Sequence, residues 1–305
     1  MQEYDLVIIG AGPAGLTAGI YASRAKLKTL LLERMMPGGQ IATTDLVENY
    51  PGFASASGME ISQIMFEQAQ KFGTEFSSAE VTELELGESD KVVKTAGGEY
   101  KAKTVLIATG SASKKMEVPG EDEFIGRGVS YCATCDGPFF EGKTVMVVGG
   151  GDAAVEEAIY LTKFAQKVYL VHRRDALRAT KFVQEKAFAN PKIEFVWDSV
   201  VEKINGSEMV ENVTVKNVKS GSLQEIVTAG IFIYIGFIPN TQFLQGKVEL
   251  NEKGYIPTTD QMETSVAGVF AAGDCREKLL RQVVTAAGDG ATAAFAAEKF
   301  IDCME

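Results

Sequence analysis

The chain has 305 residues, of which 46% are hydrophobic and 23% charged, a composition typical of a globular protein; this length predicts about two domains. A formal net charge of −11 argues against a protein that binds nucleic acid through its phosphate backbone. The sequence has no apolar stretch of about 18 residues, and its first residues lack the basic region of a signal peptide. We therefore expect a cytoplasmic protein without a membrane span.

The amino-terminal residues predict a strand–turn–helix–strand unit. Tyr4–Ile9 is an apolar run typical of a buried strand, and a helical pattern follows over 14–25. A second strand is expected at Thr29–Leu32, ending at Glu33. The turn between the first strand and the helix reads GAGPAG (10–15), a GxGxxG motif in the context that dinucleotide binding requires. Its glycines let the backbone approach a pyrophosphate, and the helix N-terminus offers free N–H groups.

The residues at the ends of the predicted strands indicate which nucleotide is bound. The Glu33 carboxylate is suited to accept hydrogen bonds from ribose hydroxyls and to repel a phosphate. The first site is therefore expected to hold a nucleotide with a free 2′-hydroxyl, such as FAD. Two further stretches, IATG (107–110) and AAGD (271–274), end predicted strands in small residues, where a flavin could pass close to the backbone.

The middle of the chain predicts mixed structure followed by a connection. A helix is expected near Gly58–Phe72, and short alternating strands from Glu75 to Tyr100. A buried strand is expected at Thr104–Ala108. Ser111–Ser130 is rich in charge, Gly and Pro and is interpreted as a linker.

The strand–turn–helix–strand pattern then returns. A strand is expected at Thr144–Val148 and a helix at Asp152–Lys163, with the GxGxxA turn GGGDAA (149–154) between them. The next strand, Val168–Val171, ends at His172, and the interval from the first glycine to this end is 23 residues in both copies. Two equally spaced copies predict two nucleotide-binding folds in one chain.

Basic residues follow the second copy, where the first copy has a carboxylate. His172 is followed by Arg173 and Arg174, and Arg178 comes four residues later. Guanidinium groups make forked, charge-assisted bonds to phosphate, so the second site is expected to prefer NADPH over NADH. His172, the only histidine, is expected to contact the adenosine; the alternative is that this stretch is a solvated, basic start of a helix.

The remaining elements suggest how the two folds are connected. Alternating strands are expected over 193–228, and a buried run, Ile231–Ile235, precedes a second linker at Gly236–Asn240. A strand at 268–274 and an Ala-rich helix, roughly Gln282–Cys303, complete the chain. The two linkers predict that a second domain, 114–242, is inserted into a first domain made of 1–113 and 243–305.

Two of the four cysteines, Cys132 and Cys135, form a CxxC motif. Zinc needs about four ligands, and the other candidates, Cys275, Cys303 and the single histidine, are scattered. A static disulfide across so short a loop would add little stability. A redox dithiol is the favoured interpretation. Asp136 follows directly and is placed to move a proton; its alternative role is as a helix N-cap or turn residue.

The two nucleotide sites and the redox dithiol together indicate one reaction. NADPH supplies two electrons, a flavin accepts them, and a disulfide takes two electrons at once. The residues by themselves thus predict an NADPH:disulfide oxidoreductase.

The motifs CATCDG, GGGDAAVEEA, HRRD, VENYPG and FAAGD, taken together over essentially the whole chain, closely resemble the bacterial low-molecular-weight thioredoxin reductases, class II pyridine nucleotide-disulfide oxidoreductases. The resemblance implies an α/β fold of two Rossmann-like, three-layer ββα domains, with the NADPH domain inserted into the FAD domain and carrying the dithiol. It also implies a homodimer, one FAD per subunit, and thioredoxin as the substrate.

The resemblance implies a role for each matching residue. Cys135 would exchange electrons with the flavin, Cys132 would attack the thioredoxin disulfide, and Asp136 would act as acid and base. The residues expected to bind FAD are Gly10, Gly12, Pro13, Ala14, Gly15, Glu33, Arg34, Gly39, Gln40, Asn49, Val81, Ala108, Thr109, Gly110, Gly273, Asp274, Arg281, Gln282 and Val283. The residues expected to bind NADPH are Gly151, Asp152, Ala153, Glu156, His172, Arg173, Arg174, Arg178, Ile235 and Gly236.

The resemblance also implies that the inserted domain rotates on linkers near Lys115–Gly120 and Gly236–Asn240, because the nicotinamide and the dithiol both need one flavin face. Two positions depart from the pattern: Ala153 stands where many relatives have Ser or Thr, and Phe237 replaces a common His. The competing functions are reduction of another small thiol protein, use of ferredoxin as donor, a dithiol oxidase that reduces oxygen, and a flavin-bound redox sensor.

Overall fold

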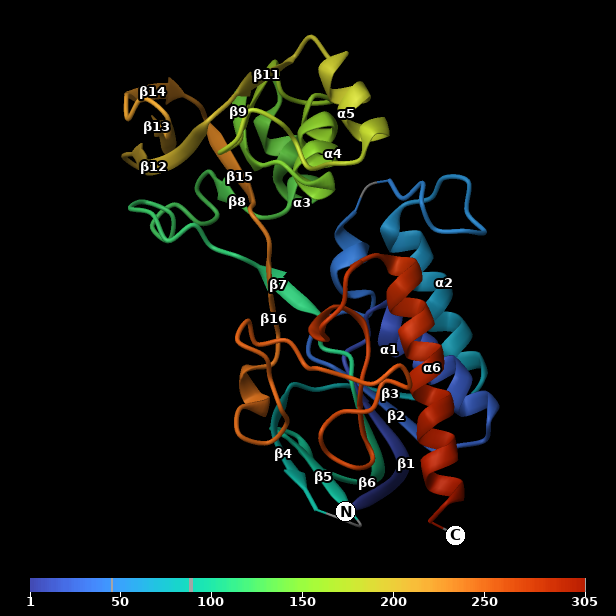
Figure 1. Ribbon diagram of the computed structural model, residues 1–305. Helices are drawn as coiled ribbons and strands as arrows, with labels where there is room; N and C mark the ends of the chain where they lie inside the picture. Colours follow the sequence, from blue (N-terminus) through green and yellow to red (C-terminus); the bar gives the residue numbers. More distant parts are fainter. Residues whose placement is uncertain (45, 88–89, 305) are drawn as a thin grey trace. The chain divides into compact units, whose positions relative to one another are not determined.

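The computed structural model describes residues 1–44, 46–87 and 90–304, and the chain divides into two compact units (Figure 1). The first unit consists of Met1–Ala112 and Ile238–Glu305, and the second of Ser113–Phe237. The second unit is therefore an insertion in the sequence of the first. The boundaries expected from the sequence, after residues 113 and 242, lie one and five residues later than these.

A mostly parallel sheet forms the centre of the first unit. Its strands follow the order β3-β2-β1-β6-β5-β4, and β17 pairs with the end of β6. Strands β1, β2, β3, β6 and β17 are parallel, whereas β4 and β5 are antiparallel to their neighbours. The strands are β1 (Gln2–Ile9), β2 (Thr29–Glu33), β3 (Glu75–Ser78), β4 (Val81–Leu86), β5 (Lys91–Thr95), β6 (Gly98–Ile107) and β17 (Val269–Ala271).

Three helices lie side by side against this sheet (Figure 1). The first begins at Pro13, whose fixed φ and missing N–H suit a first helical turn. The second begins after Ser57, whose Oγ accepts a hydrogen bond from the Glu60 N–H at 3.1 Å. Within the described residues no helix is both long and apolar enough to cross a membrane. The helices are α1 (Pro13–Arg24), α2 (Gly58–Lys71) and α6 (Val283–Asp302), with 3-10 turns η1 (Gly39–Thr43), η3 (Gln242–Leu244) and η4 (Gly273–Cys275).

The surroundings of strand β1 explain why its sequence is apolar throughout. Leu6 and Ile8 pack in the cluster under the helices, whereas Val7 and Ile9 pack in a second cluster on the opposite face. Successive side chains of a strand point to opposite faces, so a sheet that is covered on both sides needs apolar residues at every position. The unit is thus built in three layers, as predicted.

The second unit repeats this plan. Its parallel sheet has the order β11-β10-β9-β15-β8, and an antiparallel sheet, β12-β13-β14, forms a separate layer. Val145 and Val147 of β9 face the cluster with the helices, while Met146 and Val148 face the cluster with the antiparallel sheet. The predicted fold class, α/β with two Rossmann-like domains, is confirmed. The elements are β8 (Val129–Ser130), α3 (Ala133–Asp136), η2 (Gly137–Phe140), β9 (Thr144–Gly149), α4 (Asp152–Leu161), β10 (Lys167–Val171), α5 (Lys181–Phe188), β11 (Ile193–Val196), β12 (Ser199–Gly206), β13 (Val210–Asn217), β14 (Leu223–Val227) and β15 (Gly230–Tyr234).

The interpretation of Ser111–Ser130 as a linker is wrong for most of its length. Its first residues do connect the units, because β7 (Ser111–Ser113) pairs with the return connection β16 (Phe237–Pro239). Its later part belongs to the second unit: Phe124 is 2% exposed, and β8 is a strand of the parallel sheet. The hinge expected near Lys115–Gly120 also lies inside the second unit, where the Pro119 carbonyl accepts a hydrogen bond from the Ile204 N–H of β12, so this expectation is wrong. Local composition does not reveal such packing, because the few apolar residues that attach the segment to the core, Met116, Val118, Phe124 and Val129, stand among charged residues and glycines.

Candidate active site and nucleotide sites

The three glycines of the first turn have different surroundings. A Cβ on Gly10, whose φ is +106°, would lie 2.4 Å from the Ala108 carbonyl oxygen, and one on Gly15 would lie 1.9 Å from that of Gly10. Near a Cβ on Gly12, in contrast, the only atom within 4 Å in the described chain is the Cα of Gly39, at 3.9 Å. The first and third glycines thus serve the chain's own packing, whereas the second leaves open backbone that a pyrophosphate can approach.

A pocket of about 280 Å³ lies at the carboxyl ends of β1, β2 and β6. The Glu33 carboxylate borders it and accepts hydrogen bonds from the N–H groups of Ala11, at 2.9 Å, and Met35, at 3.1 Å. The structure thus brings together, at one edge of the sheet, five of the residues predicted to bind FAD. These residues are Gly10, Glu33, Arg34, Val81 and Thr109.

Two buried side-chain atoms near the start of α6 are left without hydrogen-bond partners in the described chain. Neither Asp274 Oδ1 nor Arg281 Nε has a hydrogen-bond partner among the described residues. Burial raises the pKa of Asp274, against the opposing charges of Lys278 and Arg281. Buried polar atoms are nearly always hydrogen-bonded, so these two atoms fit a polar ligand, such as the sugar or phosphate part of a flavin nucleotide.

Two other predicted FAD residues, Gly39 and Gly273, lie close to the first turn. Gly39 approaches Gly12, as described above, and a Cβ on Gly273 would lie 3.0 Å from that of Ala14. Other predicted FAD residues contact parts of the chain outside this turn. Asn49 Nδ2 donates to Gln282 Oε1 at 3.1 Å. Gln40 Nε2 donates to the Ser111 carbonyl, and the Thr109 hydroxyl donates to the Asn240 carbonyl. Gly110 has φ +63°, and Val283 packs on the apolar core. Pro13, within the turn itself, opens α1.

The second glycine turn repeats the pattern of the first. A Cβ on Gly149 would lie 2.4 Å from the Tyr234 carbonyl oxygen, and one on Gly150 would lie 2.4 Å from the His172 ring. A Cβ on Gly151 would meet no described atom within 4 Å. Here too the middle of the turn is open, so it can accept a pyrophosphate.

Positive charge surrounds the end of β10. His172 is 5% exposed, and its Nε2 has no hydrogen-bond partner in the described chain. Burial lowers its pKa. The charges of Arg178, Arg173 and Arg174 lower this pKa further, so all three arginines lie within electrostatic reach of the ring. All three are exposed.

The backbone fixes this arginine segment to the glycine turn. The N–H groups of Arg178 and Ala179 donate to the Gly150 carbonyl at 2.6 and 3.1 Å. Asp152 accepts a hydrogen bond from the Thr180 N–H at 2.7 Å. The other predicted NADPH residues are less closely connected to the glycine turn. Ala153 lies in the first turn of α4, and Glu156 is exposed on the same helix. Ile235 packs against the core just after β15, and the Gly236 carbonyl accepts a hydrogen bond from the Lys114 N–H.

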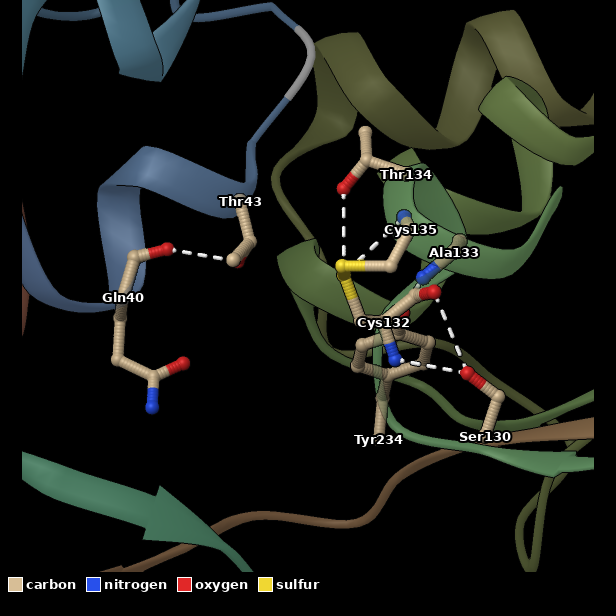
Figure 2. The surroundings of a disulfide bond; sticks show 8 residues. All are labelled: Gln40, Thr43, Ser130, Cys132, Ala133, Thr134, Cys135 and Tyr234. Atoms are coloured by element: carbon tan, nitrogen blue, oxygen red, sulfur yellow. Dashed lines mark hydrogen bonds between the residues drawn. A yellow bond between two sulfur atoms is a disulfide. The ribbon is translucent and has the colours of Figure 1, made fainter. Parts of the chain in front are cut away.

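Cys132 and Cys135 are joined by a disulfide with an S–S distance of 2.10 Å (Figure 2). Cys132 precedes α3, and its Sγ accepts a hydrogen bond from the Cys135 N–H at 3.2 Å. Thr134 Oγ1 lies 3.5 Å from the same sulfur. Asp136 is the last residue of α3 and stands at the N-cap position of η2, although its side chain makes no capping hydrogen bond there. The alternative role of Asp136, as a helix N-cap or turn residue, thus agrees with its position but has no side-chain hydrogen bond behind it.

Two residues that sequence reasoning missed hold the disulfide loop (Figure 2). The Ser130 hydroxyl accepts a hydrogen bond from the Cys132 N–H at 3.0 Å. The Tyr234 hydroxyl accepts one from the Ala133 N–H at 2.8 Å. A signal for Tyr234 was present, because it is a polar-tipped residue at the carboxyl end of the apolar run 231–235, beside the glycine turn.

Comparison with known proteins agrees with this arrangement. Residues 4–290 match the family described as pyridine nucleotide-disulphide oxidoreductase. The chain is 54% identical to thioredoxin reductase of Bacillus subtilis, over 99% of this chain and 96% of that one. It matches the crystal structure of Lactococcus lactis thioredoxin reductase with a TM-score of 0.97 and 48% identity, covering 98% and 99% of the two chains. For the crystal structure of T. acidophilum thioredoxin reductase the TM-score is 0.95, at 34% identity, covering 100% of both chains. The chain therefore belongs to the pyridine nucleotide-disulphide oxidoreductase family and, within it, to the low-molecular-weight thioredoxin reductases.

Proposed function

We propose that the protein is a thioredoxin-disulfide reductase that uses NADPH, FAD and the Cys132–Cys135 pair. The observation that carries the proposal is the disulfide itself, in a CxxC loop of a unit that also holds a nucleotide-type glycine turn. Bound NADPH and FAD would supply a two-electron donor and a relay. Full-length relatives that are named thioredoxin reductases support thioredoxin as the partner.

We propose the first unit as the FAD site. The open backbone at Gly12, the Glu33 carboxylate, and the unpaired atoms of Asp274 and Arg281 fit a dinucleotide with a free 2′-hydroxyl. Glu33 would accept from the ribose while it keeps its bond to the Ala11 amide, because a carboxylate oxygen can accept more than one hydrogen bond. Arg281 would donate to the bound group.

We propose the second unit as the NADPH site. The open Gly151 backbone would face the pyrophosphate, and the exposed guanidiniums of Arg173, Arg174 and Arg178 would contact a 2′-phosphate. The neutral ring of His172 would donate or accept one hydrogen bond at the adenosine. Ala153 has no hydroxyl, so binding of the 2′-phosphate would depend on the three arginines.

The dithiol performs the exchange with the partner. The Cys132 thiolate attacks one sulfur of the thioredoxin disulfide, forming a mixed disulfide and releasing one thioredoxin thiolate. The Cys135 thiolate then attacks Cys132 Sγ, which releases the second thioredoxin thiolate and restores the Cys132–Cys135 disulfide. Asp136 gives a proton to a departing thiolate and takes one from an attacking thiol.

We also propose how the second unit moves, where the protein acts and in which oligomeric state. The connections β7 and β16 would act as hinges for the second unit, because they join it to the first and Gly236, with φ +132°, has no described atom close to its Cβ position. The protein would act in the cytoplasm as a homodimer. Exposed apolar side chains along the helices of the first unit, including Tyr21, Ile64 and Phe295, fit a protein interface.

One assay separates this function from its competitors. NADPH and NADH oxidation are followed with and without a panel of thioredoxins, and flavin bleaching is recorded at the same time. Turnover that needs both NADPH and a thioredoxin supports the proposal. Oxygen consumption without thioredoxin would indicate a dithiol oxidase, and bleaching without turnover would indicate a sensor. A flavin that NADPH does not bleach would contradict the proposed electron source.

A further inference from the structure

One buried carboxylate organises the segment between the first connection and the dithiol. Glu121 is 1% exposed. Its Oε1 accepts a hydrogen bond from the Met116 N–H at 2.9 Å, and its Oε2 accepts from those of Glu117 and Val118, at 2.5 and 3.4 Å. Three successive amides thus converge on one side chain, which offsets the cost of burying its charge.

The fourth donor to Glu121 comes from the disulfide segment. The Tyr131 hydroxyl donates to Glu121 Oε1 at 2.6 Å, and Tyr131 directly precedes Cys132. Burial raises the pKa of Tyr131, and the bond to Glu121 raises it further, so the hydroxyl stays a donor. The Tyr131 ring packs against the same apolar cluster as Met116 and Val118. One carboxylate and one ring therefore join two segments that lie more than ten residues apart.

The turn at the other end of this linkage is itself held firmly. Glu117 has φ +61°, a left-handed conformation that is unfavourable for a residue with a Cβ, and its N–H is bonded to Glu121. A Cβ on Gly120 would lie 2.1 Å from the Ile204 carbonyl oxygen, and the Ile204 N–H donates to the Pro119 carbonyl at 2.9 Å. The turn is thus fixed to β12, and Glu121 extends this fixation to Tyr131.

We propose that Glu121 and Tyr131 are positioning residues for the dithiol. They fix the backbone of Cys132 to the turn at which the second unit begins, so that the disulfide is presented in one geometry during electron exchange. The inference rests on the proposed function, because it assigns the pair a part in the redox cycle. A role confined to folding would affect stability alone, whereas a positioning role affects the rate of dithiol formation as well.

The test compares Tyr131→Phe and Glu121→Gln with wild-type holoenzyme. After mixing with NADPH without thioredoxin, samples are quenched with an alkylating reagent, and the reduced Cys132–Cys135 pair is counted by mass spectrometry. We expect each variant to form the dithiol about fivefold more slowly or worse, with the initial rate of flavin bleaching within about twofold of wild type. Tyr169→Phe is the matched control, because Tyr169 packs on the same cluster, and should match wild type.

The double variant sharpens the test. Because the two residues form one linkage, Glu121→Gln with Tyr131→Phe should be no slower than the slower single variant. Dithiol formation within about twofold of wild type in Tyr131→Phe, whatever its melting temperature, would overturn the proposal. Tyr131→Phe leaves Glu121 with its three amide donors, so it tests the idea even where Glu121→Gln does not fold. Wild-type enzyme that forms the dithiol but does not reduce thioredoxin would refute the partner and leave this inference standing.

Discussion

The Tyr234 hydroxyl accepts a hydrogen bond from the Ala133 N–H, 2.8 Å away, although 101 residues separate the two in the sequence. Tyr234 ends β15, and Ala133 is the first residue of the short helix inside the disulfide loop. The loop that carries the redox pair is therefore held by the strand that lines the second glycine turn.

This bond predicts the effect of Tyr234→Phe. Ala133 is fully buried, so removing the hydroxyl leaves its amide without its partner, and we expect the free energy of unfolding to fall by about 1–2 kcal/mol. Urea denaturation measures the change. The control, Tyr21→Phe, alters an exposed tyrosine of the first unit and should stay within about 0.5 kcal/mol of wild type. An equal change in both variants would show that the bond contributes nothing.

The proposed roles of the two disulfide cysteines predict separable losses. In Cys132→Ser, flavin bleaching by NADPH should persist, while reduction of thioredoxin should be abolished, because the attacking sulfur is lost and Cys135 alone cannot form the disulfide that takes electrons from the flavin. Stopped-flow absorbance and a thioredoxin turnover assay measure the two steps. Cys303→Ser changes an exposed cysteine outside the loop and should leave both steps intact. Thioredoxin turnover in Cys132→Ser would refute the assignment.

The arginines at the end of β10 predict coenzyme preference. Arg174→Ala with Arg178→Ala should raise the KM for NADPH by about tenfold or more, since each lost charge-assisted bond costs about 1.5–3 kcal/mol, and should change the KM for NADH much less. Steady-state kinetics with both coenzymes measure the difference. Arg24→Ala, on α1 of the first unit, is the control. Equal increases for the two coenzymes would rule out a phosphate clamp.

Glu33 predicts the strength of flavin binding. Glu33→Ala removes the acceptor of the Ala11 amide and the proposed acceptor of the ribose, so FAD should bind about tenfold more weakly or worse. Fluorescence of released flavin during dialysis or titration gives the dissociation constant. Glu99→Ala, at an exposed position of β6, should keep wild-type affinity. Unchanged affinity in Glu33→Ala would place the nucleotide elsewhere.

Cys275 predicts a pH effect on stability. Its thiol donates to the Ile107 and Ala272 carbonyls, and burial raises its pKa to about 11, above the value of about 8.5 in an unfolded chain. The contribution of this thiol is complete below the unfolded pKa and is lost as pH rises towards 11, because only the unfolded state then releases the proton. Urea denaturation from neutral to alkaline pH should show a smaller loss in Cys275→Ala than in wild type. At pH 8, iodoacetamide should modify Cys303 but not Cys275 in the folded protein.

The sequence by itself determined the parts of the protein whose chemistry is local. The positive φ values of Gly10 (+106°) and Gly149 (+153°) are set within each turn and favour glycine there, and the CxxC pair is close enough to bridge across one short loop. For the same reason the periodic patterns predicted the strands around both turns: a strand buried on both faces must be apolar along its own length. These features can be predicted without knowing which distant residues they contact.

The tertiary structure decided what depends on contacts between distant segments. Composition suggested a linker at Ser111–Ser130, yet Phe124 is buried in a core and Glu121 accepts a bond from Tyr131. Tyr234 acquired its role only when β15 came to lie beside the disulfide loop. A hydrogen bond across many residues leaves no periodic trace in the sequence, because either partner alone is an ordinary residue of a turn or strand. Only the folded chain brings donor and acceptor together.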